Sequence, residues 1–254
     1  MKKIMSIIIL FFAFITIPKA LPLPVDVTAD SVVVMDMDTG EILYEKNPDK
    51  QQILASLTKM MTAYTALNEI NNLDKKITIT EEDFKFDPVF TLAGLQVGDR
   101  VSYRDLLYGA LLQSGADAAQ ALAIHTTGSV ESFVKEMNKN AKKLGLNHTQ
   151  FSDTIGGEED DVSTAREYAI LMRECLKNKT FKTIFGTNHK TLSNGLVVHN
   201  YTQAYAQFHG LDPSLLTGNK TGYTTEAGLT IASTATINDI HYGTVLLKCS
   251  INEY

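Results

Sequence analysis

The sequence is poor in cysteine and has no pattern of metal ligands. Its 254 residues include six histidines and two cysteines, Cys175 and Cys249. Two cysteines are too few for a disulfide framework, and the choice between a pair and two free thiols stays open. Neither a C-x-x-C nor an H-E-x-x-H motif occurs, and the histidines lack the spacing of metal ligands. We therefore expect neither a metal nor a cofactor.

An excess of positive charge is also absent. Lysine and arginine together number 23 and aspartate and glutamate 29, which gives a formal net charge of −6 at pH 7. An acidic chain is a poor nucleic-acid binder, so we exclude nucleic acid as a partner. The sequence has no internal repeat, and 44% of it is hydrophobic. It is long enough for one large domain or two small lobes.

The longest apolar run lies at the N-terminus. Lys2 and Lys3 precede the apolar residues 4–17, and Pro18-Lys19-Ala20 ends the run. A basic start, a short apolar stretch and a small residue predict a signal peptide over residues 1–20, because the run is short for a membrane span. An uncleaved N-terminal anchor is the alternative. We expect residues 21–254 to form the exported domain.

Strand patterns lie at both ends of this domain, with helical patterns between them. Helical periodicity begins near Ile53, and the span of about 53–180 is predicted to be mainly helical. The predicted strands are 31–36, 41–45, 215–223, 229–236 and 242–249. This order predicts an α+β fold, in which the N- and C-terminal strands form one antiparallel sheet packed with helices, and a mainly helical lobe stands beside it.

Three residues are predicted to begin helices. Ser102 and Ser129 have the side chains that N-cap positions prefer. Thr164 followed by Glu167 matches a full capping box. Asp105 stands at the corresponding position after Ser102, where a box usually has Glu or Gln, so we predict a simple cap there.

Ser56 and Lys59 form an S-x-x-K pattern near the start of the first predicted helix. At this spacing both side chains lie on one face of the helix. A serine becomes a strong nucleophile when a base removes its proton. A lysine acts as that base when burial or a second cation lowers its pKa. A solvated lysine on a surface helix is the alternative, since the bare pattern is common.

Lys220-Thr221-Gly222 is the second notable motif. Lys220 is the candidate second cation, and together with Thr221 it is suited to binding a carboxylate. On an edge strand, Gly222 would let a substrate backbone come close and pair with the strand. An ordinary lysine before a strand is the alternative.

Together these motifs resemble the serine-type D-alanyl-D-alanine carboxypeptidases, which are low-molecular-weight penicillin-binding proteins. The resemblance runs from about residue 25 to the C-terminus. It rests on the combination of motifs at residues 34–48, 55–63, 163–166, 218–224 and 227–228. It implies a β-lactamase/transpeptidase-like fold, peptidoglycan stem peptides ending in D-Ala-D-Ala as substrates, and β-lactam antibiotics as covalent inhibitors. It also implies a location at the cell wall or the outer face of the cytoplasmic membrane.

The resemblance implies a role for each site residue. Ser56 would be the acylated nucleophile and Lys59 its general base. Ser114, in Ser114-Gly115-Ala116-Asp117, would relay protons. Lys220 and Thr221 would bind the substrate carboxylate, beside Gly222. The backbone N–H groups of Ser56 and Tyr223 would form the oxyanion hole.

Three features depart from the family pattern. Ala116 stands where the family usually has an asparagine. Residues 154–161 replace the usual Pro-x-Gly-Leu loop. The sequence ends at Tyr254, before the helix that usually carries a carboxylate-binding arginine. We expect that the C-terminal part of the family domain is missing, and that the membrane is reached only through an uncleaved N-terminus or a missing C-terminal anchor.

Two further functions stay open beside an exported D,D-carboxypeptidase. One is a catalytically impaired protein that binds peptidoglycan and penicillin, which Ala116 motivates. The other is a serine β-lactamase, which needs a dedicated deacylating glutamate. Glu158, Glu159 and Glu167 do not lie in the Glu-x-x-x-Asn pattern of such enzymes.

Overall fold

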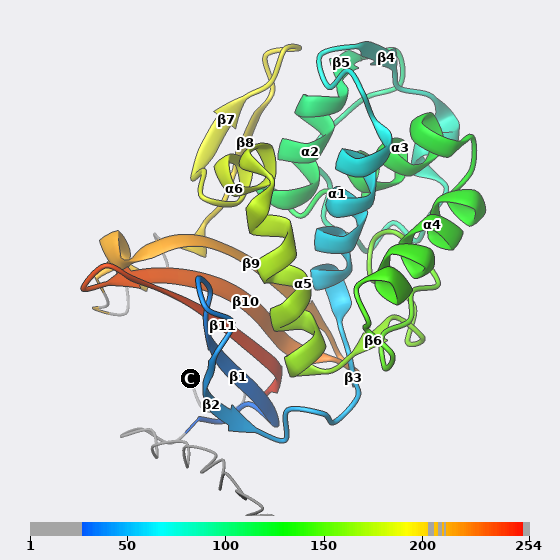
Figure 1. The fold of residues 1–254 in the computed structure, drawn as a ribbon. Coiled ribbons are helices and arrows are strands. Elements are labelled where there is room, and N and C mark those ends of the chain that lie inside the picture. Colours follow the sequence, from blue (N-terminus) through cyan, green and yellow to red (C-terminus); the bar gives the residue numbers. More distant parts are fainter. Residues whose placement is uncertain (1–26, 203–205, 208–209, 211, 251–254) are drawn as a thin grey trace, which may run out of the picture.

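One antiparallel sheet joins the two ends of the chain. The computed structural model describes residues 27–202, 206–207, 210 and 212–250, so the predicted signal peptide lies outside the described residues. The strand order is β2-β1-β11-β10-β9 (Figure 1). These strands are β1 (Ser31–Asp36), β2 (Ile42–Lys46), β9 (Leu216–Thr224), β10 (Gly228–Ile237) and β11 (Ile240–Cys249). The predicted α+β fold is confirmed.

Alternation along the strands gives this sheet its packed face. In β11 every second residue from Gly243 to Cys249 is buried, as the two-residue period of a strand requires. Val245 and Leu247 of β11 join Val33 of β1 in the main core. Helix α5 (Ala165–Lys177) packs across β1 and β11. It therefore links the sheet to the other helices.

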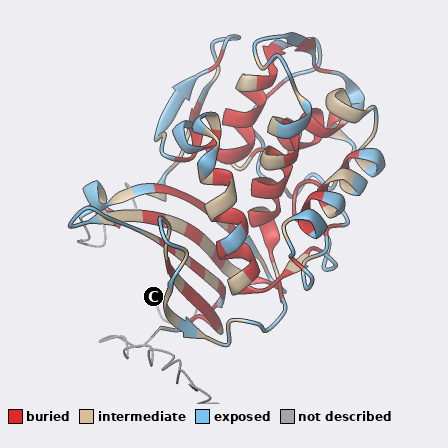
Figure 2. Cartoon of the chain, in the orientation of Figure 1, coloured by how far each residue is buried: buried red, intermediate tan, exposed pale blue. Residues whose placement is uncertain are grey.

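The remaining helices form a lobe around α1 (Thr58–Glu69), which packs against α2, α3, α4 and α5. Figure 2 shows buried residues concentrated on α1, α2 and α3 and exposed ones on the outer side of α4. The other helices are α2 (Tyr103–Leu111), α3 (Ala116–Thr127), α4 (Val130–Lys143) and α6 (Lys179–Phe185). Among the described residues, no helix is both long and apolar enough to cross a membrane.

Short elements connect these helices. Three two-stranded ribbons pair β3 with β6, β4 with β5 and β7 with β8. Their bounds are β3 (Gln52–Ile53), β4 (Lys76–Thr78), β5 (Arg100–Ser102), β6 (Val162–Ser163), β7 (His189–Thr191) and β8 (Val197–His199). The 3-10 turns are η1 (Ala55–Leu57), η2 (Glu81–Phe84) and η3 (Pro213–Leu215).

The helix caps follow the prediction at α4 and depart from it at α2 and α5. Ser129 accepts a hydrogen bond from Ser132 N at 3.1 Å and caps α4, as predicted. Ser102 accepts from Asp105 N at 3.1 Å, and the Asp105 carboxylate accepts from Ser102 N at 2.9 Å. The prediction of a simple cap was wrong, because the shorter aspartate side chain also closes the box.

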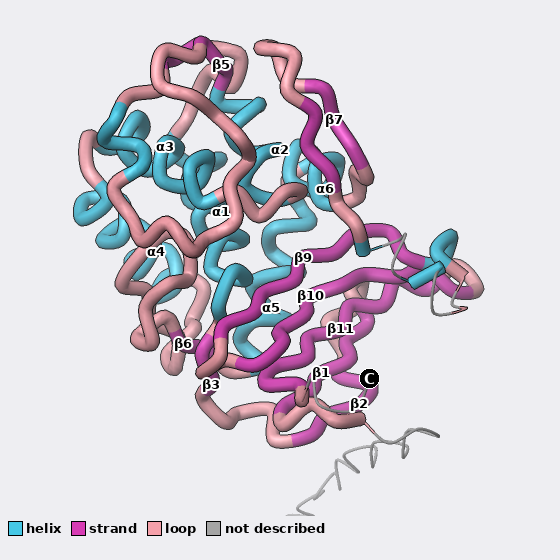
Figure 3. Tube along the Cα trace, turned by 180° about the vertical axis from the view of Figure 1, so that it is seen from behind, coloured by secondary structure: helices cyan, strands magenta, loops and turns pink. Residues whose placement is uncertain are grey.

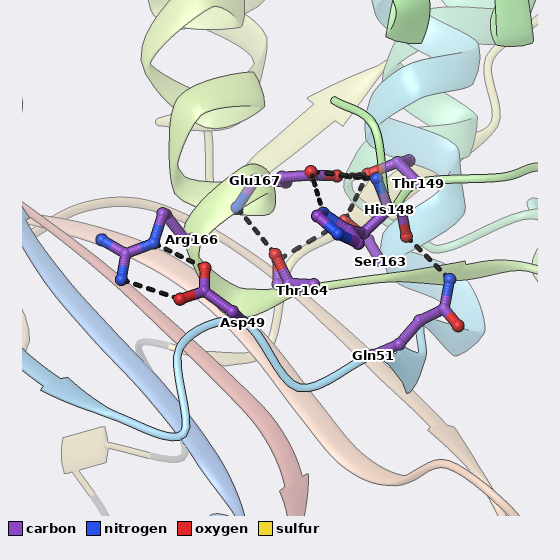
Figure 4. A network of polar contacts seen from close by, with 8 residues as sticks. All are labelled: Asp49, Gln51, His148, Thr149, Ser163, Thr164, Arg166 and Glu167. Atoms are coloured by element: carbon purple, nitrogen blue, oxygen red, sulfur yellow. Dashed lines mark hydrogen bonds and ion pairs between the residues drawn. The ribbon is translucent and has the colours of Figure 1, made fainter. Parts of the chain in front are cut away.

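At α5 only half of the predicted capping box forms (Figure 4). Thr164 Oγ1 accepts from Glu167 N at 3.1 Å. The Glu167 carboxylate instead accepts from His148 N at 3.0 Å and from the Thr149 hydroxyl at 2.6 Å. Arg166 Nε donates to Asp49 Oδ1 at 2.6 Å. These contacts hold the start of α5 to the segments that lead into β3 and β6.

Candidate active site

Ser56 lies in η1, between the short strand β3 and helix α1. We expected helical periodicity from about Ile53, but α1 begins at Thr58, and Ile53 pairs with Val162 instead. Ala55 has a φ of 50°, in the left-handed region, so the chain turns sharply before the serine. This turn places Ser56 where the sheet meets the helical lobe.

Lys59 occupies the first turn of α1 and is 1% exposed. Its Nζ donates to Ser56 Oγ at 2.9 Å and to the backbone oxygen of Ile155 at 2.7 Å. The predicted pair of nucleophile and base is therefore within hydrogen-bond reach. The contact with Ile155 fixes the amine from the other side.

Burial lowers the pKa of Lys59 from 10.5 to about 8, because removal from water penalises the ammonium form. The negative charges of Asp153, Asp117 and Asp161 act in the opposite direction. A pKa near 8 leaves a useful fraction of the amine neutral at neutral pH. A neutral amine is what a general base requires.

Ser114 and Lys220 form a second pair of serine and lysine. Lys220 Nζ donates to Ser114 Oγ at 2.8 Å. Ser114 has a φ of 61°, and Lys220 is 2% exposed. Burial and then repulsion from Lys59 hold the pKa of Lys220 well below its usual value. The structure thus brings four predicted site residues into one polar array of two hydrogen-bonded pairs, in which both lysines are buried.

Gly222 lets strand β9 approach the nucleophile closely. A Cβ atom at this position would lie 2.7 Å from Ser56 N and 2.7 Å from Thr230 Oγ1. The Thr230 hydroxyl donates to Leu54 O at 2.9 Å and so joins β10 to the turn before Ser56. Figure 3 shows β9 as the sheet strand nearest the helical lobe. β9 is an edge strand of the sheet, the kind of position to which an extended peptide can add.

Thr221 and Tyr223 lie on the same strand as Gly222. Thr221 lines a cavity of about 240 Å³ together with Ser114 and Lys220. Tyr223 is 53% exposed. The predicted substrate-binding residues therefore follow one edge strand beside the polar array.

Ala116 and Asp117 begin α3, directly after the Ser114 turn. Ala116 is buried and has no polar side-chain atom. The Asp117 carboxylate accepts from Ala93 N at 2.7 Å and from Leu95 N at 3.0 Å. Asp117 is therefore engaged in holding the preceding loop.

Sequence reasoning missed two parts of the site. The Ile155 carbonyl is a backbone atom, so its residue type carries no signal for its role. The aromatic wall of the 240 Å³ cavity comes from His199 and Tyr201, whose rings stack with centroids 5.5 Å apart. His199 ends β8 and Tyr201 follows it, in a ribbon for which we predicted no element. A usable signal was Asn194-Gly195, a pair typical of hairpin turns, followed by the β-branched Val197-Val198.

The cysteines lie away from this array. Cys175 in α5 and Cys249 in β11 are buried free thiols, and burial raises the pKa of both. Within the described part of the chain, no group of three or more His, Cys, Asp or Glu side chains is arranged to hold a metal ion.

Several known proteins are similar to this chain. D-alanyl-D-alanine carboxypeptidase DacF of Bacillus subtilis is 34% identical over 217 residues, which cover 82% of this chain and 54% of DacF. A D-alanyl-D-alanine endopeptidase of Pseudomonas aeruginosa is 34% identical over 226 residues, covering 87% of this chain and 72% of the endopeptidase. The chain thus spans about half the length of DacF.

Solved structures share the fold. A D-alanyl-D-alanine carboxypeptidase of Mycobacterium tuberculosis has a TM-score of 0.83 at 26% identity, covering 93% of this chain and 88% of that one. A Streptomyces DD-transpeptidase has a TM-score of 0.79 at 32% identity, covering 89% and 91%. The family model described as D-alanyl-D-alanine carboxypeptidase matches residues 17–250. With its paired serines and lysines on this fold, the chain belongs to the D-alanyl-D-alanine carboxypeptidase family.

Proposed function

We propose that this protein is an exported serine D,D-carboxypeptidase, which removes the terminal D-alanine from peptidoglycan stem peptides. The observation that carries the proposal is the contact of Lys59 Nζ with Ser56 Oγ at 2.9 Å, in a site where burial lowers the pKa of the lysine. A hydroxyl beside a partly neutral buried amine is equipped for nucleophilic attack.

Acylation begins when the neutral Lys59 amine accepts the Ser56 proton. Ser56 Oγ then attacks the carbonyl carbon of the penultimate D-alanine, and the carbonyl oxygen becomes an oxyanion. The backbone N–H groups of Ser56 and Tyr223 are the proposed donors to that oxyanion. The terminal carboxylate of the substrate lies against Lys220 and Thr221 and favours the ammonium form of Lys220.

The tetrahedral intermediate collapses when the peptide C–N bond breaks. The proton that Lys59 took from Ser56 passes through Ser114, which accepts a hydrogen bond from Lys220 at 2.8 Å, to the departing D-alanine nitrogen, and Lys59 is neutral again. Neutral Lys59 then takes a proton from the water that attacks the Ser56 ester and returns it to Ser56 Oγ as the shortened peptide leaves. A β-lactam would acylate Ser56 by the same route, with its ring nitrogen in place of the leaving amine.

Export is part of the proposal, because the proposed substrate lies outside the cytoplasm. The basic and apolar N-terminal segment supports it as a secretory signal. The proposed site of action is the cell wall or the outer face of the cytoplasmic membrane.

A slow, peptidoglycan-binding protein is the second candidate, and Ala116 favours it. The alanine offers no hydrogen bond to a substrate amide or to Lys59. Losing one such polar contact costs about 1–3 kcal/mol. In this case the protein would be acylated by penicillin but would release D-alanine poorly.

Intact-protein mass after incubation with benzylpenicillin, combined with a D-alanine release assay on a diacyl-D-Ala-D-Ala peptide, tests the proposal. The expected result is a covalent adduct on Ser56 together with D-alanine release, and loss of both in Ser56→Ala. An adduct without release would favour the second candidate. Rapid destruction of penicillin without an adduct would indicate a β-lactamase.

A further inference from the structure

The Lys59 amine has one contact that takes no part in bond making. Its hydrogen bond to Ser56 must change as the serine loses its proton and becomes acylated. Its hydrogen bond to the Ile155 carbonyl, at 2.7 Å, has no such reason to change. The position of Ile155 therefore sets the position of the amine during the reaction. That position matters, because a small displacement of a catalytic group lowers the reaction rate.

Asp153 shapes the loop that carries this carbonyl. Its Oδ1 accepts from Ile155 N at 2.8 Å and from Gly156 N at 2.6 Å. Its Oδ2 accepts from Gly157 N at 2.7 Å and from Glu158 N at 3.2 Å. A carboxylate is acceptor-only and has room for all four donors. The side chain thus folds four consecutive peptide units around itself.

The same loop is pressed against the turn that holds the nucleophile. Gly156 has a φ of +80°, and a Cβ atom there would lie 1.9 Å from Ala55 O. Thr62 of α1 donates its hydroxyl to Thr154 O at 2.7 Å. Any change in the loop is therefore transmitted to Lys59 and to the residue before Ser56.

Asp161 closes the loop and joins it to α1. It is fully buried, and its Oδ1 accepts from Ser152 N at 2.6 Å and from Asp153 N at 3.2 Å. Its Oδ2 accepts from the Thr58 hydroxyl at 2.8 Å, one residue before Lys59. Leu54 N donates to Asp161 O at 2.9 Å. Asp161 thus contacts the loop and both sides of the Ser56 turn.

We propose that Asp153 and Asp161 are positioning residues, a carboxyl pair that holds the Ile155 carbonyl on the Lys59 amine and so fixes the base of the acylation step. This inference rests on the proposed function, in which Lys59 is that base. Neither residue touches the substrate; both act through the loop of residues 152–161.

Within this pair, Asp161 favours its protonated form. Burial and the adjacent Asp153 carboxylate, which repels its charge and hydrogen-bonds to it, raise the pKa of Asp161 well above the usual range. Asp161 is therefore protonated at neutral pH, and the pair carries a single negative charge. The charged groups that face Lys59 are then the Asp153 and Asp117 carboxylates, with Lys220 as the repelling cation.

Alanine and asparagine variants test the proposal in the full chain. Asp153→Ala removes the acceptor of four N–H groups, and the expected second-order rate of acylation by a fluorescent penicillin is at least tenfold lower. The amide of Asp161→Asn resembles a protonated carboxyl, because it has one oxygen that accepts and one group that donates. Its acylation rate is expected to stay within threefold of that of the unaltered protein. Asp160→Asn is the matched control, because Asp160 is exposed in the same loop.

The pH profile of acylation separates positioning from simple loss of stability. Asp153 raises the pKa of Lys59, so Asp153→Ala should move the acid limb of the profile to lower pH while its plateau falls. Circular dichroism and thermal melting would confirm that the variants are folded. If Asp161→Asn does not fold, the comparison of Asp153→Ala with Asp160→Asn still decides the question.

Acylation of Asp153→Ala at the rate of the unaltered protein, or an unmoved acid limb, would overturn the inference. If Asp161→Asn loses more than tenfold in acylation rate while Asp160→Asn reacts at the normal rate, the assignment of a protonated Asp161 is overturned. D-alanine release is scored separately. An unaltered protein that is acylated but releases no D-alanine refutes the carboxypeptidase function and leaves the positioning comparison intact. Absence of any acylation refutes both.

Discussion

The contact between strand β9 and the Ser56 turn gives a prediction with a magnitude. In Gly222→Ala the added methyl group would lie 2.7 Å from Ser56 N, and ordinary contact begins at 3.4 Å. The strand or the turn must therefore move by roughly 0.7 Å, and such a misplacement of catalytic groups costs on the order of 10²-fold. We expect penicillin acylation to slow by about 30- to 100-fold, equivalent to about 2–3 kcal/mol in the activation barrier. Overpacking should also lower the free energy of unfolding by about 1–3 kcal/mol.

The assay is the second-order rate of acylation by a fluorescent penicillin, measured with a thermal melt of the same sample. Thr224→Ala is the control on the same strand. Its side chain accepts from Ala227 N at 3.0 Å and shapes the following turn. This control should lose little acylation rate. A Gly222→Ala protein that is acylated within threefold of the normal rate would refute the argument, since β9 would not need to approach Ser56 so closely.

Three further predictions concern the buried ionisable groups and the second motif. The acylation rate should rise as the pH increases through about 8, because the neutral form of Lys59 is the base and its pKa is about 8; a profile that is flat from pH 6 to 10 would contradict this role. Ala116→Asn should raise the acylation rate by about fivefold or more if a side-chain amide regains a contact worth about 1 kcal/mol or more; an unchanged or lower rate would show that the site has adapted to alanine. Because the folded-state pKa of Asp161 is raised, the folded protein binds the extra proton, and stability falls as the pH rises from the unfolded pKa, near 4, toward the folded one. Urea unfolding of Asp161→Asn should show a weaker decline over this range, and an unchanged decline would assign the effect to other groups.

The fold could be predicted from the sequence because its signals are local. Runs of β-branched and apolar residues in 31–36 and 242–249 marked strands, and the periodicity of residues 54–67 marked α1. The antiparallel sheet then followed from the order of the elements. The boundary at Ile53 was wrong, because pairing with Val162 makes this residue part of a strand. That pairing is a tertiary contact between distant segments, and hydrophobic periodicity does not report it.

The candidate site could be predicted only in part. Ser56, Lys59, Ser114 and Lys220 were expected together, and the structure brings them within hydrogen-bond reach in pairs. Their roles stay proposals until the enzyme is assayed. The Ile155 carbonyl escaped prediction, because a backbone atom leaves no trace in the residue type.

The loop around Ile155 escaped prediction for a different reason. In the sequence, Asp153 and Asp161 flank an acidic run, which is typical of a surface loop. The run itself, Glu158-Glu159-Asp160, is indeed exposed. Burial of Asp161 depends on the fold around α1. Charge patterns in the sequence do not distinguish a solvated carboxylate from a buried one.

The strand order has a consequence for when the protein becomes active. β1 lies between β2 and β11, so the first hairpin of the domain joins the rest of the sheet through the last strand in the chain. Ser56 is early in the sequence, yet Gly222 and Thr230 hold its turn from β9 and β10. Contacts across such long sequence separations form late in folding. A chain still being synthesised therefore has Ser56 but no assembled site, and the arrangement around Ser56 is complete only when the C-terminal strands have arrived.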